Sequence, residues 1–258
     1  MSNGVGEHVG VLVVMNDVTK LRRLENVRQD FVANVSHELR TPITAIRGYV
    51  ETLLDGALDI RKDAVKFLNI VLHHSERLSA IIDDLLSLSR IEVETEERDI
   101  VREQGQLLPV LEAAIDSCRL DADKKNIRIN VDCSESLRLP MNTTLLEQAV
   151  INLLVNSIKY SENDTEIDVS AAEVEGGKGR LVEIAVEDMG CGIARDHLPR
   201  LFERFYRSDQ ARSRELGGTG LGLAIVKHIT QAHDGTVKVE SVVGEGSTFT
   251  LILSGEES

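Results

Sequence analysis

The chain has 258 residues, of which 42% are hydrophobic, and its formal net charge is −14. This is enough apolar sequence to bury a core, and the length favours two modest domains over one. The negative charge argues against nucleic acid or an anionic membrane surface as a partner. The three cysteines, Cys118, Cys133 and Cys191, lack the spacing of a metal site or a disulfide framework, which fits a reducing cytosol.

The first predicted element is a short buried strand at residues 8–15. Its apolar run, Val9 to Met15, is far shorter than the roughly 20 residues that a membrane-spanning helix needs. A lone strand has no sheet of its own, so we interpret residues 1–16 as the end of an upstream domain and expect the natural protein to be longer. Residues 17–30 are then a helical linker.

A helical hairpin is predicted next, with one helix from about Leu21 to Leu54 and a second from about Arg61 to Glu92. Asp55-Gly56 marks the break between them, and the acidic run from Glu92 to Asp99 is interpreted as a linker. The apolar stripe of the second helix is widened beyond what one partner helix covers. We therefore predict a homodimer in which two hairpins form a four-helix bundle. The widening residues are Leu68, Leu72, Ile82 and Leu86.

From residue 100 onward the pattern becomes mixed, with helices near residues 106–122, 143–160 and 219–233. Strand-like runs lie between them and predict a sheet covered by helices on one face. These runs are Ile127 to Cys133, Glu166 to Ala172, Leu181 to Glu187, Thr236 to Ser241 and Ser247 to Leu253.

His37 is the candidate for covalent chemistry on the first helix, where the heptad pattern places it at the outermost position. Thr41 lies one turn further along, and Glu38 flanks the imidazole and can accept its proton. Neutral imidazole is a nucleophile near neutral pH. Pro42 removes the amide that would bond the carbonyl of Glu38, so we expect the helix to bend there. A bare His-Glu pair is usually a solvated surface pair, but the whole run from Ser36 to Pro42 favours the catalytic interpretation.

A second candidate site begins on the helix at residues 143–160, where Asn152 and Asn156 point away from the apolar face. An amide oxygen is a suitable neutral ligand for Mg²⁺, and Lys159 supplies charge for a phosphate. Tyr160 follows on the adjoining face. A capped, solvent-facing helix is the alternative that two asparagines alone do not exclude.

Two glycine-rich segments complete this predicted nucleotide pocket. Asp188 ends a strand and precedes Gly190 and Gly192, where the backbone can approach a flat ring closely while the carboxylate accepts from an exocyclic amine. The second segment leads directly into a helix, whose N-terminal N–H groups favour phosphates. Glycine-rich loops are weak indications when they stand alone. The second segment contains Gly217, Gly218, Thr219, Gly220, Leu221 and Gly222.

Taken in order, these segments closely resemble the sensor histidine kinases of two-component systems, from about residue 17 to residue 254. Ser36 to Pro42 resembles the H box of that family. The other four motifs also match in order: Asn152 and Asn156 the N box, Asp188 to Gly192 the G1 box, Phe202 to Tyr206 the F box, and Gly218 to Gly222 the G2 box. The opening strand resembles the exit from a PAS sensor domain.

The resemblance implies an α+β chain with a helical-hairpin dimerisation and phosphotransfer domain at residues 31–95. A catalytic ATP-binding domain at 96–258 follows, with the α/β sandwich of the Bergerat type that gyrase, heat-shock-90 and MutL ATPases share. It further implies ATP and Mg²⁺ as ligands, His37 as phosphoacceptor, Asn156 as metal ligand and Asp188 as the adenine-recognising carboxylate. The full set of implied nucleotide-binding residues is Asn152, Asn156, Lys159, Tyr160, Asp188, Gly190, Gly192, Phe205, Gly218, Thr219, Gly220, Leu221 and Gly222.

The implied function is autophosphorylation of His37 from Mg-ATP and transfer of the phosphoryl group to an aspartate of a response regulator. Glu38 and Thr41 match the Glu-x-x-Thr pattern with which many such kinases also dephosphorylate their regulator. An enzymatic alternative is a phosphatase-biased relative with weak kinase activity, and a non-enzymatic alternative is an ATP-binding dimeric scaffold. The resemblance also implies a cytoplasmic fragment of a protein that is anchored in the bacterial inner membrane through upstream segments.

Overall fold

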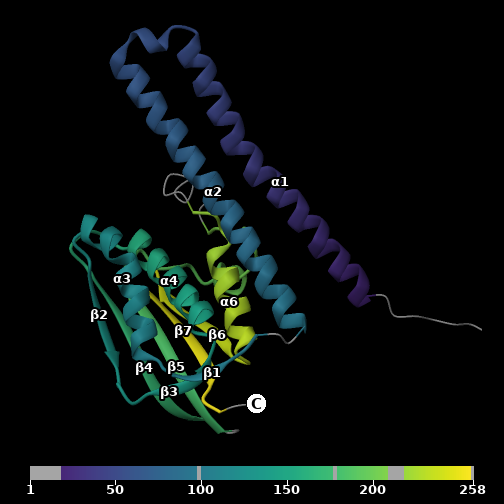
Figure 1. The fold of residues 1–258 in the computed structure, drawn as a ribbon, viewed down its shortest axis with the longest axis vertical. Helices are drawn as coiled ribbons and strands as arrows, with labels where there is room; N and C mark the ends of the chain where they lie inside the picture. The colour runs from purple at the N-terminus through teal and green to yellow at the C-terminus, as the bar shows by residue number, and fades with distance from the viewer. Residues whose placement is uncertain (1–18, 98–99, 177–178, 209–217, 257–258) are drawn as a thin grey trace, which may run out of the picture. The chain divides into compact units, whose positions relative to one another are not determined.

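A computed structural model of the chain describes residues 19–97, 100–176, 179–208 and 218–256 (Figure 1). The strand expected at residues 8–15 and the upstream-domain remnant at 1–16 lie outside these described residues. The linker expected at 17–30 is helical from Thr19 onward. The chain forms two compact units, Met1–Thr41 and Pro42–Ser258.

The helical hairpin is confirmed as α1 (Thr19–Leu54), the short 3-10 helix η1 (Ala57–Asp59) and α2 (Arg61–Glu97). The predicted break lies at Gly56, whose φ of 117° is a left-handed conformation that glycine adopts without strain. Near the turn, the ring of Tyr49 packs on that of Phe67 with their centroids 5.5 Å apart. Pro42 lies inside α1, which stays helical on both sides of it, and the bend expected there remains a prediction.

The acidic linker expected from Glu92 to Asp99 is wrong from Glu92 to Glu97, because α2 continues to Glu97. Glutamate is a good helix former, and Glu92 is held by contacts to residues far along the chain. Leu88 and Ile91 are buried in the same cluster as the core of the following domain. The end of α2 therefore packs as part of that domain's core.

The second domain contains a five-stranded sheet in the order β2 (Arg128–Cys133), β4 (Glu166–Gly176), β5 (Gly179–Asp188), β7 (Gly246–Ser254), β6 (Thr236–Val242). Strands β2 and β4 are parallel and the other pairs are antiparallel. All five strands were expected from the sequence. Two further strands, β1 (Glu103–Gln106) and β3 (Arg138–Met141), form a small antiparallel sheet that the sequence did not indicate.

Three helices cover one face of the five-stranded sheet: α3 (Leu108–Lys124), α4 (Thr143–Tyr160) and α6 (Gly222–Ala232) (Figure 1). Burial alternates along β5 and β7, as expected when one face of a sheet packs on helices. A short 3-10 helix, η2 (Leu198–Arg200), lies between β5 and α6 in the sequence. The predicted fold class, a helical hairpin followed by a helix-covered α/β sheet, is confirmed.

Candidate functional site

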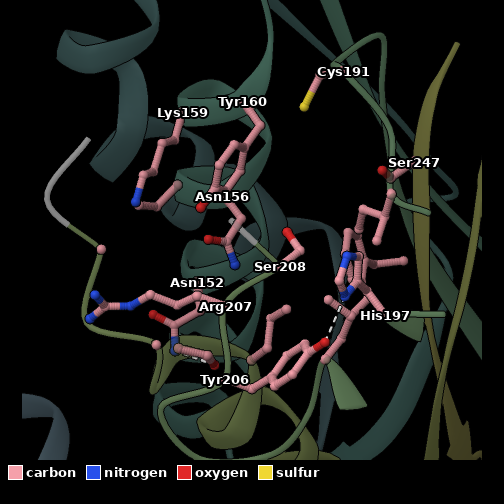
Figure 2. Close-up of a pocket in the computed structure, with 18 of the residues that line it drawn as sticks. Asn152, Asn156, Lys159, Tyr160, Cys191, His197, Tyr206, Arg207, Ser208 and Ser247 are labelled. Carbon is pink, nitrogen blue, oxygen red and sulfur yellow. Dashed lines mark hydrogen bonds between the residues drawn. The ribbon is translucent and has the colours of Figure 1, made fainter. Parts of the chain in front are cut away.

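A cavity of about 620 Å³ opens between α4, the loop after β5 and the start of α6 (Figure 2). Figure 2 shows Asn152, Asn156 and Lys159 on one side of the view and His197 and Ser247 on the other. Most of the residues that the sequence assigned to a nucleotide pocket line this single cavity. They are Asn152, Asn156, Lys159, Tyr160, Asp188, Gly192, Gly218, Thr219, Gly220 and Gly222.

Helix α4 presents its two asparagines because its other face is buried. The N-cap is Asn142, whose side-chain oxygen accepts from the amide of Leu145 over 3.1 Å and starts the helix. Asn152 donates to the carbonyl of Gly222 over 3.4 Å, and Asn156 is half-buried one turn further on. The buried face that fixes this rotation contains Leu146, Ala149, Val150, Leu153 and Leu154.

Asp188 lies at the end of β5 with only 6% of its surface exposed. One carboxylate oxygen accepts from the amide of Gly190 over 2.9 Å and the other from the hydroxyl of Ser157 over 3.2 Å. Burial raises the pKa of Asp188, while the hydrogen bonds from Gly190 and Ser157 oppose that rise. The site therefore holds a desolvated acceptor at one end of the cavity.

Ser157 was missed in the sequence, although it directly follows Asn156 on the side of α4 that faces the core. A small hydroxyl residue among large apolar ones on a buried helix face is a signal for a hydrogen-bond donor, because buried polar groups are paired. The sequence did not indicate the hydrogen-bond partner of Ser157, because that partner, Asp188, lies on another element.

Gly192 and Gly220 have left-handed backbones, with φ of 67° and 78°. A Cβ at Gly192 would lie 2.0 Å from the carbonyl oxygen of Val242, and one at Gly220 would lie 2.9 Å from the backbone of Phe205. Both positions therefore require glycine for conformation and for space. The glycine-rich loops were expected to approach a flat ring closely. In the structure Gly192 and Gly220 closely approach the backbone of Val242 and Phe205.

Lys159 and Arg207 make part of the cavity wall cationic, and Figure 2 shows both across the view from Ser247, the strand partner of Asp188. Burial, followed by the nearby charges of Arg207 and Arg77, lowers the pKa of Lys159 to about 8. Arg207 also lines the cavity and donates to the carbonyl of Thr219 over 2.8 Å. Clustered cations that repel one another are favourable surroundings for a polyanion. Arg207 is a lining residue that the sequence did not single out.

Three residues assigned to the pocket do not line the cavity. Leu221 is fully buried as the N-cap of α6, so its side chain belongs to the core. Gly190 lies behind Asp188 and donates to it. Phe205 packs against the core and donates its amide to the carbonyl of Gly220 over 2.7 Å. These three residues contact the lining residues or the core and do not face the cavity. They support the loops and need not contact a ligand.

His37 belongs to the other compact unit, on the exposed surface of α1, with 68% of its side chain accessible. The Oε1 atom of Glu38 lies 3.9 Å from its Nδ1 atom, close enough for electrostatic support but too far for a hydrogen bond. The hydroxyl of Thr41 donates to the carbonyl oxygen of His37 over 3.1 Å. The accessible position and the flanking carboxylate agree with the predicted geometry, whereas the Thr41 hydroxyl is turned to the backbone.

Among the residues that the structure describes, no cluster of three or more histidine, cysteine, aspartate or glutamate side chains could hold a metal ion. The candidate ligand Asn156 is an amide on the cavity wall. Mg²⁺ usually keeps water and substrate phosphates as most of its ligands, so a single protein oxygen there fits it. Within the same described ranges, no helix has the length and apolar composition to cross a membrane.

Two family profiles match the chain. The His Kinase A (phospho-acceptor) domain matches residues 27–94, and the histidine kinase-, DNA gyrase B- and HSP90-like ATPase domain matches residues 141–257. The phosphate regulon sensor protein PhoR of Pseudomonas aeruginosa is 40% identical over 244 residues, which cover 93% of this chain and 53% of that protein. The chain spans about half the length of the curated relatives it matches.

Solved structures agree with this assignment. The histidine kinase AdeS of Acinetobacter baumannii matches with a TM-score of 0.67 and 27% identity, over 86% of this chain and 98% of that one. The histidine kinase ThkA, solved in complex with the response regulator protein TrrA, shares the fold with a TM-score of 0.72 and 22% identity, over 93% of this chain and 65% of that one. The phosphoacceptor-domain match on the hairpin and the ATPase-domain match around the cavity occur in the order of the predicted motifs. The chain therefore belongs to the sensor histidine kinases of two-component systems.

Proposed function

We propose that this chain is an ATP-dependent protein-histidine kinase core in which the cavity binds Mg-ATP and His37 accepts the γ-phosphoryl group. The observation that carries the proposal is the polarity of the cavity. A buried, hydrogen-bonded carboxylate, Asp188, lines the same cavity as two amides and two cations, which are Asn152, Asn156, Lys159 and Arg207. An adenine amine suits the carboxylate, and a triphosphate suits the cations.

In the proposed step the imidazole of His37 attacks the γ-phosphorus of ATP. A nitrogen–phosphorus bond forms while the bond to the β,γ-bridging oxygen breaks, and its electron pair leaves with ADP. Glu38 accepts the imidazole proton. Mg²⁺, held through Asn156 and phosphate oxygens, would neutralise negative charge on the triphosphate. The contribution of the chain is mainly positioning and electrostatic stabilisation.

Phosphotransfer to an aspartate on a response regulator is the second part of the proposal. The solved complex of the similarly folded kinase ThkA with the regulator protein TrrA supports a regulator as the partner. We also propose that Thr41, with Glu38, promotes hydrolysis of the regulator's phosphoryl group. Thr41 is exposed on the same face as His37, one turn away, as this role requires.

A homodimer formed through the hairpin is supported by apolar side chains that the single chain leaves in solvent. An unpartnered row of large apolar residues on a long helix indicates an interface. We place the hairpin domain at residues 31–95 and the catalytic domain at 96–258. The exposed apolar residues on α2 include the four that widen its stripe, Leu68, Leu72, Ile82 and Leu86.

The proposed pocket is tested by separating binding from chemistry. Calorimetric titration with Mg-ATP should give the same affinity for the wild type and His37→Gln, because His37 does not line the cavity. Asp188→Asn should bind at least tenfold more weakly, because the adenine amine loses a charged acceptor. Equal affinity in Asp188→Asn and the wild type would show that this cavity is not the nucleotide site.

A further inference from the structure

The end of α2 is attached to the catalytic domain by one face. Leu88 and Ile91, both almost fully buried, belong to the same apolar cluster as the core of that domain. All residues from Pro42 to Ser258 form one compact unit. Within this unit, α2 therefore shares a packed interface with the domain that forms the cavity.

Two acidic side chains extend this interface along α2. Glu92 accepts from the guanidinium of Arg204 and lies 3.2 Å from Nε2 of His228 on α6. About two turns earlier on the helix, Oδ2 of Asp84 accepts from the hydroxyl of Thr219 over 2.6 Å. Asp84 also lines the nucleotide cavity, so α2 contributes a carboxylate to the wall of that cavity.

Thr219 lies in the glycine-rich segment that leads into α6. Its hydroxyl oxygen accepts from the amide of Leu221 over 3.2 Å, and its only hydroxyl hydrogen is donated to Asp84. A phosphate oxygen at this segment would need that same hydrogen. The phosphate would also be repelled by the negative charge of Asp84. Burial raises the pKa of Asp84, and the hydrogen bond from Thr219 opposes that rise and so favours the charged form.

We propose that Asp84 is a built-in competitor of the nucleotide triphosphate: the Asp84–Thr219 contact and a bound triphosphate exclude each other at Thr219. Docking of α2 then lowers the affinity of the cavity for ATP. By thermodynamic linkage, ATP weakens the docking of α2 by the same factor. This inference rests on the proposed function, because it requires that the cavity binds ATP.

Asp84 should compete only with ligands that carry phosphates, so a ligand without phosphates serves as a control. The whole chain is titrated with Mg-ATP and, separately, with adenosine, which lacks the groups that would reach Thr219. Asp84→Ala should bind Mg-ATP at least about tenfold more tightly than the wild type, the scale expected for releasing one hydrogen bond to a charged group. Its affinity for adenosine should stay unchanged. Asp84→Asn, which keeps the shape of the side chain and loses the charge, should show an intermediate gain.

Asp83→Ala is the matched control, because Asp83 is the neighbouring carboxylate and is exposed. It removes the same charge from the chain and should leave the affinity for Mg-ATP within about twofold, since exposed charges are well screened. Equal Mg-ATP affinity in Asp84→Ala and Asp83→Ala would overturn the inference. So would a gain for adenosine as large as that for Mg-ATP, which would mean a general opening of the cavity. Absence of Mg-ATP binding in every variant, the wild type included, would instead refute the proposed function itself.

Discussion

The hydroxyl of Ser157 donates to Oδ2 of Asp188 over 3.2 Å, and so joins the last turn of α4 to the end of β5. Both residues are buried. The bond links the helix that presents Asn152 and Asn156 to the carboxylate that lines the same cavity. It also favours the charged form of Asp188 in a place where burial favours the neutral form.

Ser157→Ala should therefore shift the acid side of the pH dependence of ATP binding. The pKa of Asp188 is already raised by burial, so its acceptor charge, and with it ATP affinity, is lost as pH falls through that raised value. Removing the Ser157 hydrogen bond, which opposes the effect of burial, raises the pKa of Asp188 further and moves the loss of affinity to higher pH. Calorimetric titrations with ATP across the acid range measure this shift. Identical acid limbs in the variant and the wild type would contradict it.

Lys159→Arg should remove the loss of ATP affinity at basic pH. The lowered pKa of about 8 means that Lys159 in the free protein loses its charge as pH rises through that value. ATP affinity of the wild type should fall above this pH because the triphosphate loses a cation. Arginine stays charged throughout, so the affinity of the variant should be flat between about pH 7 and pH 9.5. Parallel slopes in both proteins would show that another group causes the fall.

Gly192→Ala should destabilise the fold by more than about 1 kcal/mol, because φ is 67° and the new Cβ would lie 2.0 Å from the carbonyl oxygen of Val242. Gly48→Ala is the matched control, since nothing lies within 4 Å of its added Cβ in α1. That substitution should be neutral or stabilise by about 0.5–1 kcal/mol. Urea denaturation of both variants measures the difference. A Gly192→Ala protein as stable as the wild type would show that the loop is not fixed as described.

Thr41→Ala should separate the two proposed activities of the hairpin. The hydrogen bond that it removes is on the surface and ends on a carbonyl of the same helix, so the fold should persist. Phosphorylation of His37 should stay within about twofold, while dephosphorylation of a phosphorylated regulator should fall at least tenfold, the usual scale for a group that positions a reacting water. Thr41→Ser keeps the hydroxyl and should retain both activities. Loss of dephosphorylation in Thr41→Ser as well would argue against a role for the hydroxyl.

Much of the fold could be predicted because its signals are local. Apolar periodicity and the Asp55-Gly56 break gave the hairpin, and alternating runs gave the five-stranded sheet. The strand Glu103–Gln106 has no apolar or β-branched residue, and Arg138–Met141 contains a proline, so neither resembles a strand. They pair with each other, which depends on long-range contact rather than on their own propensity.

The candidate site divides in the same way. Asn152, Asn156 and Asp188 follow from spacing within one helix or at the end of one strand, and the structure places all three on one cavity. Ser157, Arg207 and Asp84 were not foreseen, because their importance comes from partners in other elements. Glu92 was assigned to a linker for the same reason, since Arg204 lies far along the chain. Local patterns predict which groups are available, and tertiary contacts decide which of them act together.

Transfer of phosphate to His37 is the central claim. The most direct measurement incubates the chain with γ-labelled ATP and Mg²⁺ beside His37→Gln, and follows label that survives alkali and is released by acid. The account predicts such label in the wild type and none in the variant, with ATP binding equal in both. Label of the same kind in His37→Gln, or ATP binding without any label in the wild type, would contradict it.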